Sequence, residues 1–314
     1  MMDPPEHMES RVVSTPKIAL DVFEGVVLYL DRRGLRALAC VCRFLKHVAT
    51  KERAWRKENV PYVGQAYLPA FSATFPAPKG IQINMMPILA NNLTGTLPED
   101  CRGYRDMIQQ CLLLKNNGVV YLTIDERRVP AGEAHRRSGL HVESPVVRSG
   151  DPLAGIKRKQ AEKTATKKSR GRIMFNWGFG SVDSVTSLPV DGIYFGSNIA
   201  HSSRLYRHVV LNTALVGRDG DLGSVRHLFS GPMDLKAGAI FWMTDKTPHE
   251  SLPLPGRGMV YRQFFRLVVG PIDVWFSKHN TLNPHGVLPD CQITDIDKFA
   301  DIRTESKATS STAT

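Results

Sequence analysis

The spacing of apolar and polar positions separates an N-terminal helical part from a longer β-rich part. In residues 17–60, apolar side chains recur every three or four positions, which is the pattern of one buried helix face. Asp21 precedes Glu24 by three residues and predicts a helix start of the capping-box type. The polar stretch 31–34 ends this helix, and a second apolar set follows it. We expect a small helical module over 17–60 and a disordered segment over 1–16.

Residues 61–114 are predicted to be a connecting segment with one helix. Proline, glycine and small residues are frequent from 61 to 100, a composition that favours extended chain over regular structure. The stretch 102–114 instead has helical composition. We expect the extended part to wrap around the domain that follows.

From residue 115 the pattern changes to short β-branched and aromatic runs bounded by Gly, Pro and Asn, which are typical of strands. The predicted strands are 119–124, 192–195, 208–211, 239–243, 260–269 and 272–276. Many short strands without regular intervening helices indicate a sandwich or barrel rather than alternating βα units. The expected fold class is α+β, in which the helical module precedes a mainly β domain over 115–300.

The net charge of +11 changes this picture only locally. Residues 151–175 contain eight Lys or Arg and two Asp or Glu, so this stretch alone contributes 8 − 2 = +6. We expect a basic, disordered insertion over 148–175 inside the β domain, and a disordered Ser/Thr-rich tail over 301–314. Two basic clusters, 157–159 and 167–170, have the spacing of a bipartite nuclear signal, and a plain flexible insertion explains them equally well.

Cysteine usage and hydropathy indicate the compartment. The five cysteines form no Cys-x-x-Cys pair and leave one over, which is typical of a reducing environment. The N-terminus has no apolar signal core, and no uncharged apolar run approaches the ~20 residues that span a bilayer. We expect an intracellular protein, cytoplasmic or nuclear, that has no membrane partner.

The candidate chemistry begins with two separated histidine segments. His141 and Glu143 are two residues apart, so on a strand they face the same side. His249 follows the predicted strand 239–243 on a short loop, where a rigid strand would fix its position. Two histidines and one carboxylate are the donor set of a facial iron(II) site that leaves three positions open. A metal site with these three ligands is the hypothesis.

Arg262 and Arg266 share one face of the predicted strand 260–269. A guanidinium can hold a carboxylate through two parallel hydrogen bonds, as the co-substrate 2-oxoglutarate would require. Arg262 is the leading candidate for this anchor and Arg266 the second. A non-catalytic interpretation is also open: histidines satisfied by hydrogen bonds, Glu143 paired with an arginine, and both strand arginines facing solvent from an edge.

The order His-x-Glu, long insert, glycine turn, strand, His and then Arg on the next strand resembles the iron(II)/2-oxoglutarate oxygenases of the double-stranded β-helix (jelly-roll, cupin-like) fold. The resemblance implies Fe(II) and 2-oxoglutarate as cofactors. The implied metal ligands are His141, Glu143 and His249, and the implied co-substrate anchors are Arg262 and Arg266. Two departures are a Glu where Asp is usual and a gap of 249 − 143 = 106 residues between ligands. A cupin-like domain that has lost its metal is the alternative.

The N-terminal module resembles an F-box, the domain that docks the adaptor subunit of a cullin-type ubiquitin ligase while a downstream domain selects substrates. The matching positions are Leu20, Tyr29–Asp31, Leu35, Val41–Arg43 and Trp55. The family motif begins Leu-Pro, whereas this chain has Asp21 at the second position. The resemblance implies adaptor contacts by Leu20, Leu30, Leu35 and Trp55. An ordinary three-helix lead-in to the next domain is the alternative.

Together the two resemblances predict an F-box-type protein whose C-terminal domain recognises a protein or nucleic-acid target and, if it is an enzyme, oxidises it. The other prediction is a non-catalytic substrate receptor of the ubiquitin ligase with a metal-free, cupin-like binding domain. The sequence leaves both open.

Overall fold

The computed structural model describes residues 62–63, 66–113, 118–148 and 172–297 of the 314-residue chain. The chain divides into two units, Met1–Val60 and Pro61–Thr314, and every described residue belongs to the second. The predicted helical module with its adaptor contacts, the N-terminal segment 1–16 and the tail 301–314 lie outside the described residues. These stay predictions.

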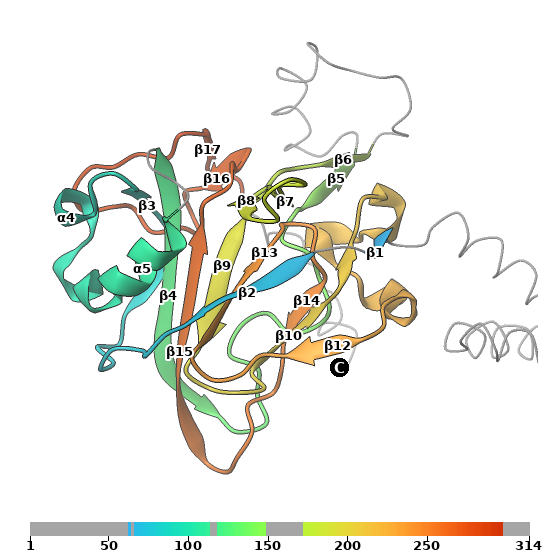
Figure 1. The fold of residues 1–314 in the computed structure, drawn as a ribbon, viewed down its shortest axis with the longest axis horizontal. Helices are drawn as coiled ribbons and strands as arrows, with labels where there is room; N and C mark the ends of the chain where they lie inside the picture. The colour runs from blue at the N-terminus through green and yellow to red at the C-terminus, as the bar shows by residue number, and fades with distance from the viewer. Residues whose placement is uncertain (1–61, 64–65, 114–117, 149–171, 298–314) are drawn as a thin grey trace, which may run out of the picture. The chain divides into compact units, whose positions relative to one another are not determined.

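Antiparallel strands dominate the second unit, as the sequence predicted (Figure 1). Six of them form the main sheet, in which all neighbours pair antiparallel. In sheet order they are β2 (Tyr67–Ser72), β13 (Ala239–Met243), β9 (Ile193–Ser197), β15 (Met259–Val268), β4 (Val119–Pro130) and β3 (Gln82–Leu89). Because side chains alternate along a strand, the two long central strands β4 and β15 supply residues to both faces of the sheet.

A three-stranded sheet packs against one face of the main sheet. Its order is β12 (Pro232–Asp234), β10 (Ser203–Tyr206) and β14 (His249–Ser251). Apolar residues of both sheets form one core, among them Leu205 of β10, Phe195 of β9 and Phe264 of β15. Full burial of such a side chain stabilises a fold by about 1.5–3 kcal/mol. We call the side of the main sheet that meets this core its inner face.

Short helices cover the opposite, outer face of the main sheet (Figure 1). They are α4 (Leu93–Thr96), the 3-10 helix η1 (Glu99–Tyr104) and α5 (Arg105–Cys111). Met107 of α5 packs in one core with Leu122 of β4 and Leu267 of β15. The helix predicted over 102–114 is confirmed, although it is split between η1 and α5.

The remaining strands form two-stranded sheets, and the remaining helices are short 3-10 segments. The strand pairs are β1 (Tyr62–Val63) with β11 (His208–Val209), β5 (Val146–Arg148) with β6 (Arg172–Met174), β7 (Gly180–Val182) with β8 (Pro189–Asp191), and β16 (Val274–Phe276) with β17 (Gln292–Thr294). The helical segments are η2 (Thr213–Leu215), η3 (Arg218–Gly220) and η4 (Gly223–Leu228). Arg148 pairs with Arg172 across β5 and β6, so the described ends of the predicted disordered insertion 148–175 are strand instead.

Three strands, β1, β2 and β3, fall where the sequence predicted a connecting segment, and the prediction is wrong for them. β2 and β3, both within 61–114, are the edge strands of the main sheet. Pro69 lies in β2 and Pro87 in β3. A proline has no N–H for the ladder, so a sheet tolerates it at an edge, where one side of the strand has no partner. The prolines that suggested irregular chain mark edge positions.

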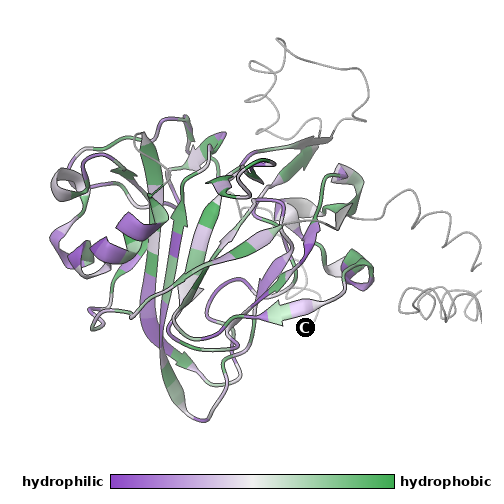
Figure 2. Ribbon diagram, in the orientation of Figure 1, coloured by the Kyte–Doolittle hydropathy of each residue, from purple (hydrophilic) through white to green (hydrophobic). Residues whose placement is uncertain are grey.

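The inner face of β4 and β15 carries polar side chains, and Figure 2 shows purple segments within both strands. On β15, Phe265 and Leu267 lie in the helix-covered core, whereas Arg262, Phe264 and Arg266 alternate with them on the inner face. The two arginines are 0% and 7% exposed, and β15 is a central strand. The interpretation that placed them in solvent at an edge is therefore wrong.

Candidate functional site

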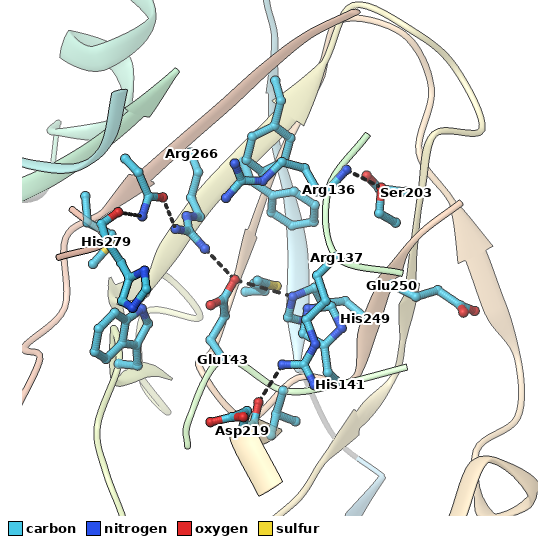
Figure 3. A pocket seen from close by; sticks show the side chains of 18 of the residues that line it. Arg136, Arg137, His141, Glu143, Ser203, Asp219, His249, Glu250, Arg266 and His279 are labelled. Carbon is cyan, nitrogen blue, oxygen red and sulfur yellow. Dashed lines mark hydrogen bonds and ion pairs between the residues drawn. The ribbon is translucent and has the colours of Figure 1, made fainter. Parts of the chain in front are cut away.

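His141 and His249 come from distant parts of the sequence and lie side by side (Figure 3). Each backbone N–H donates to the other's carbonyl at 2.9 Å, and the ring centroids are 4.4 Å apart. Each Nδ1 meets a backbone carbonyl, that of Gly139 at 2.7 Å and that of Thr247 at 2.9 Å. A proton on Nδ1 leaves the lone pair on Nε2, which is the arrangement that metal-binding histidines adopt.

The local structure of the two histidine segments differs from the prediction. His141 forms isolated bridges and belongs to no strand, whereas His249 begins β14 instead of ending a loop. The Val142 N–H donates to the Gly220 carbonyl at 2.9 Å and fixes the His141 segment. Gly220 has φ +85°, and a Cβ there would lie 2.2 Å from the Val142 carbonyl oxygen. Glycine is therefore required at this turn.

Glu143 lies beside the histidines but is bound to an arginine. Its Oε1 is 3.5 Å from Nε2 of His249 and accepts a hydrogen bond from Arg266 at 2.6 Å (Figure 3). Burial alone would raise the pKa of Glu143, but Arg266 and the two histidines outweigh burial and hold this pKa well below its usual value. The carboxylate is ionised at neutral pH. The structure thus contains the arginine pairing that the non-catalytic interpretation expected.

Arg266 reaches the cavity from β15 and has one strong partner. Its side chain is 9% exposed and donates to Glu143 from Nη1. Its Nη2 lies 3.4 Å from both Oδ1 of Asn84 and Oγ1 of Thr123, which are long contacts. Its buried Nε has no hydrogen-bond partner among the described residues. The charge of Arg266 is therefore balanced mainly by Glu143.

Arg262 is fully buried and pairs with no carboxylate in the described part of the chain. Its three nitrogens donate to the hydroxyls of Ser197, Ser251 and Ser203 at 3.1 to 3.2 Å. Burial, and then the Arg136 cation, lowers the pKa of Arg262 to about 10, so the guanidinium stays charged at neutral pH. Ser203 and Ser251 line the cavity while Arg262 stands behind them. Their polarised hydroxyls can donate to an anion.

Arg136 also lines the cavity, although no pattern in the sequence marks it as a site residue. Its Nη1 donates to Oδ2 of Asp125 at 2.9 Å, and its guanidinium lies 5.2 Å from the centre of the Phe264 ring. Arg262 lies 5.5 Å from the same ring centre. Arg136 belongs to an irregular segment, where no period tells which way a side chain points. The sequence shows that residue 136 is basic, but it does not show which way the side chain points.

These side chains surround a cavity of about 170 Å³. Its charged part holds the histidines, Glu143 and the arginines. Its apolar part is formed by Met85, Trp177, Phe195, Met243 and Phe276. A few convergent polar groups beside apolar walls are typical of a small-ligand site. The size suits a small molecule or one protruding group of a larger target.

The three candidate ligands are of residue types that bind metals, but the Glu143 carboxylate points toward Arg266. Within the described ranges, no group of three His, Cys, Asp or Glu side chains is arranged to hold a metal ion. Two imidazoles and a carboxylate are nevertheless the donor set that iron(II) takes. Burial, with His249 and Arg137 nearby, holds the pKa of His141 well below its ordinary value, so this ring is in the neutral ligand form. Glu143 must turn from Arg266 to complete the set.

Comparisons of this chain with protein-family models, with curated proteins and with solved structures found no match. Function is therefore inferred from the geometry of the cavity. No helix in the described ranges is long and apolar enough to cross a bilayer.

Proposed function

We propose that the β-rich domain is an iron(II)- and 2-oxoglutarate-dependent oxygenase of the double-stranded β-helix class, within an F-box-type protein that recognises a macromolecular target. One observation carries the proposal. His141 and His249 are anchored through Nδ1 beside the carboxylate of Glu143, in a cavity that Ser203 and Ser251 also line. These are the groups that a metal and a dicarboxylate co-substrate need.

The strand order supports the fold class. Along the chain, β4 and β9 enter the main sheet, β10 and β12 the small sheet, β13 the main sheet, β14 the small sheet and β15 the main sheet. The bridge at His141 extends the small sheet beyond β14. Two antiparallel sheets that share the chain in this way match a jelly roll. This arrangement places the histidines on one sheet and the two strand arginines on the other.

In the proposed site, His141, His249 and Glu143 hold the metal. Bound iron(II) would supply the oxidising chemistry at its open positions. The two imidazoles bind through Nε2, and the carbonyls of Gly139 and Thr247 fix the orientation of the rings. Ring orientation is therefore set before any metal arrives.

The serine pair gives a reason to prefer Arg262 over Arg266 as the anchor of the distal carboxylate. Arg262 polarises Ser203 and Ser251, which face the cavity, and none of its own donors is taken by a carboxylate among the described residues. Arg266 is bound to Glu143 in the cavity as it stands and becomes available only when Glu143 turns to the metal. The apolar walls exclude water from the charged part and so strengthen these contacts.

The test is anaerobic reconstitution of the full-length protein with iron(II). We expect about one bound iron per chain by elemental analysis and, once O₂ is admitted together with 2-oxoglutarate, slow formation of succinate and CO₂. His249→Ala should lose both, because one imidazole is too few. His285→Ala changes an exposed histidine that does not line the cavity and should keep both. Protein that takes up no iron, or His249→Ala that binds as much as the wild type, would contradict the proposal.

A metal-free binding domain of a ubiquitin-ligase substrate receptor is the second candidate, and the Glu143–Arg266 pair favours it. In such a domain the cavity only binds a ligand, so His249→Ala would leave ligand binding intact. Both candidates share the F-box proposal, in which Leu20, Leu30, Leu35 and Trp55 contact the adaptor. That part is supported by the sequence pattern.

A further inference from the structure

We propose that Arg266 is an anion receptor that Glu143 occupies as an internal stand-in, so that a metal taking Glu143 and a carboxylate ligand binding at Arg266 promote each other. The metal half of this inference rests on the proposed function. The anion half concerns the metal-free cavity and rests on the contacts of Arg266 alone.

Arg127, Arg204 and Arg226 each hold a carboxylate through two nitrogens of the guanidinium. Arg127 donates to Asp125 from Nε at 2.9 Å and from Nη2 at 2.6 Å. Arg204 donates to Asp234 from Nε at 2.5 Å and from Nη2 at 3.0 Å. Neither Arg127 nor Arg204 lines the cavity. Two-armed pairing is thus the pattern of these three pairs, whereas Arg136, which lines the cavity, donates to Asp125 from Nη1 alone.

Arg266 departs from this pattern. It lines the cavity, and it holds Glu143 through one hydrogen bond, from Nη1 at 2.6 Å. Its Nη2 has only the two 3.4 Å contacts with Asn84 and Thr123. A carboxylate that approached from the cavity could accept hydrogen bonds from two nitrogens of Arg266, whereas Glu143 accepts from Nη1 alone. A carboxylate ligand that makes two hydrogen bonds to Arg266 is therefore bound more favourably there than Glu143, which makes one.

The charge around Arg266 gives the reason why Glu143 cannot leave without a replacement. Arg136 and Arg262 lie against the ring of Phe264, on the same inner face as Arg266. Asp125 is shared by Arg127 and Arg136, so it offers little to Arg266. A buried guanidinium without a counter-ion is strongly unfavourable. If a metal takes Glu143, the vacated place beside Arg266 favours an anion.

The two binding events are therefore coupled in both directions. A metal that draws Glu143 away opens Arg266, and an anion that occupies Arg266 releases Glu143 for the metal. Such coupling is reciprocal by thermodynamic necessity. The ligand class is a small carboxylate or dicarboxylate, which the cavity of about 170 Å³ can hold. Its source is the co-substrate or an acidic group of the target.

The first experiment needs no metal. Succinate is titrated calorimetrically into full-length, metal-free protein. Glu143→Ala should bind succinate at least tenfold more tightly than the wild type, because Arg266 is open. The double variant Glu143→Ala with Arg266→Gln should lose this gain. Glu250→Ala is the matched control: it also removes one carboxylate that lines the cavity, but Glu250 pairs with Arg226 instead.

The inference is overturned if Glu143→Ala binds succinate like the wild type, if Glu250→Ala shows the same gain, or if the double variant keeps it. Thermal melting checks that each variant is folded. If Arg266→Gln fails to fold, Arg266→Lys combined with Glu143→Ala takes its place. A lysine keeps the charge without the planar fork, so it should retain only part of the gain.

The second experiment measures Mn²⁺ affinity without added carboxylate. Arg266→Gln should bind Mn²⁺ at least tenfold more tightly than the wild type, because Glu143 is free to turn. Weaker binding would mean that Arg266 assists the metal, and would overturn the inference while leaving the metal site in place. If neither protein takes up Mn²⁺ or iron(II), the proposed function and the coupling both fall, and the succinate result still decides the anion receptor.

A competition arm identifies the source of the anion. Succinate is titrated into wild-type protein that is saturated with Mn²⁺ and 2-oxoglutarate. Continued succinate binding that Arg266→Gln abolishes assigns the receptor to a second substrate. Competitive displacement that depends on Arg266 assigns it to the co-substrate. Binding or displacement that is unchanged in Arg266→Gln counts against the receptor.

Discussion

The two faces of the main sheet each bury a carboxylate, and they stabilise it in different ways. Glu126 on the outer face accepts from the backbone N–H groups of Lys79 and Ile81, and from Tyr104 and Gln263, at 2.7 to 3.0 Å. All four donors are uncharged groups. The next residue back along β4, Asp125, lies on the other side of the strand and accepts from guanidinium groups instead.

This difference indicates that the outer face has a structural role and the inner face a binding role. On the outer face, four neutral donors satisfy the hydrogen-bonding capacity of Glu126, so this carboxylate needs no cation beside it and the face holds no surplus arginine. On the inner face, the arginines outnumber the carboxylates that contact them, and part of the set lines a cavity. Surplus buried cations are costly unless a ligand or a metal-linked rearrangement balances them. The inner face is therefore where ligand chemistry is expected.

The largest effect on stability should come from Asp125→Asn. The change leaves Arg127 and Arg136 without their shared carboxylate, and a broken buried ion pair costs about 3 kcal/mol or more. Urea unfolding of the wild type and the variant measures this loss. Asp245→Asn is a suitable control, because Asp245 is equally buried but, among the described residues, accepts from Ser144 and the Trp177 N–H and from no guanidinium. Equal losses of stability in both variants would contradict the idea that Asp125 matters because it pairs with arginines.

The same variant should also change the acid side of the stability profile. Burial raises the pKa of Asp125, but hydrogen bonds from His135, Arg127 and Arg136 outweigh burial and hold this pKa far below its usual value. The stability that Asp125 contributes is thus present above the ordinary Asp pKa, about 4, and is lost as pH falls toward the folded pKa. Asp125→Asn should unfold with a shallower dependence on pH below about 4.

The sequence predicted the central strands well because β-branched and aromatic runs mark β4, β13 and β15. It missed β2 and β3 because Pro69 and Pro87 look like breakers until the sheet edge explains them. It selected His141, Glu143 and His249 by chemical type, and the structure brings them together. The sequence could not supply the contacts between distant segments. The serines that accept hydrogen bonds from Arg262 lie 11 to 65 positions away from it in the chain.

A smaller effect is expected on the outer face from Tyr104→Phe. The change removes one donor to Glu126 and leaves the other three in place, so we expect a loss of about 2 kcal/mol. Succinate and metal binding should not change, because Tyr104 lies on the outer face. Urea unfolding and the succinate titration give the two readouts. A change in succinate affinity would show that the outer network reaches the cavity and would weaken the separation between the faces.

The smallest effect should come from Arg137→Gln at the rim of the cavity. Arg137 is exposed, and it donates a hydrogen bond to the backbone carbonyl of Asp219 at 2.6 Å. Exposed substitutions usually change stability by no more than about 0.5 kcal/mol. Its neighbour Arg136 is 29% exposed and bound to Asp125, so Arg136→Gln should cost more in the same urea experiment. If the two variants lose the same free energy of unfolding, stability depends on the number of arginines near the cavity and not on which carboxylates they pair with. The contrast between the two faces would then reduce to net charge, because partner geometry would no longer distinguish a satisfied cation from a surplus one.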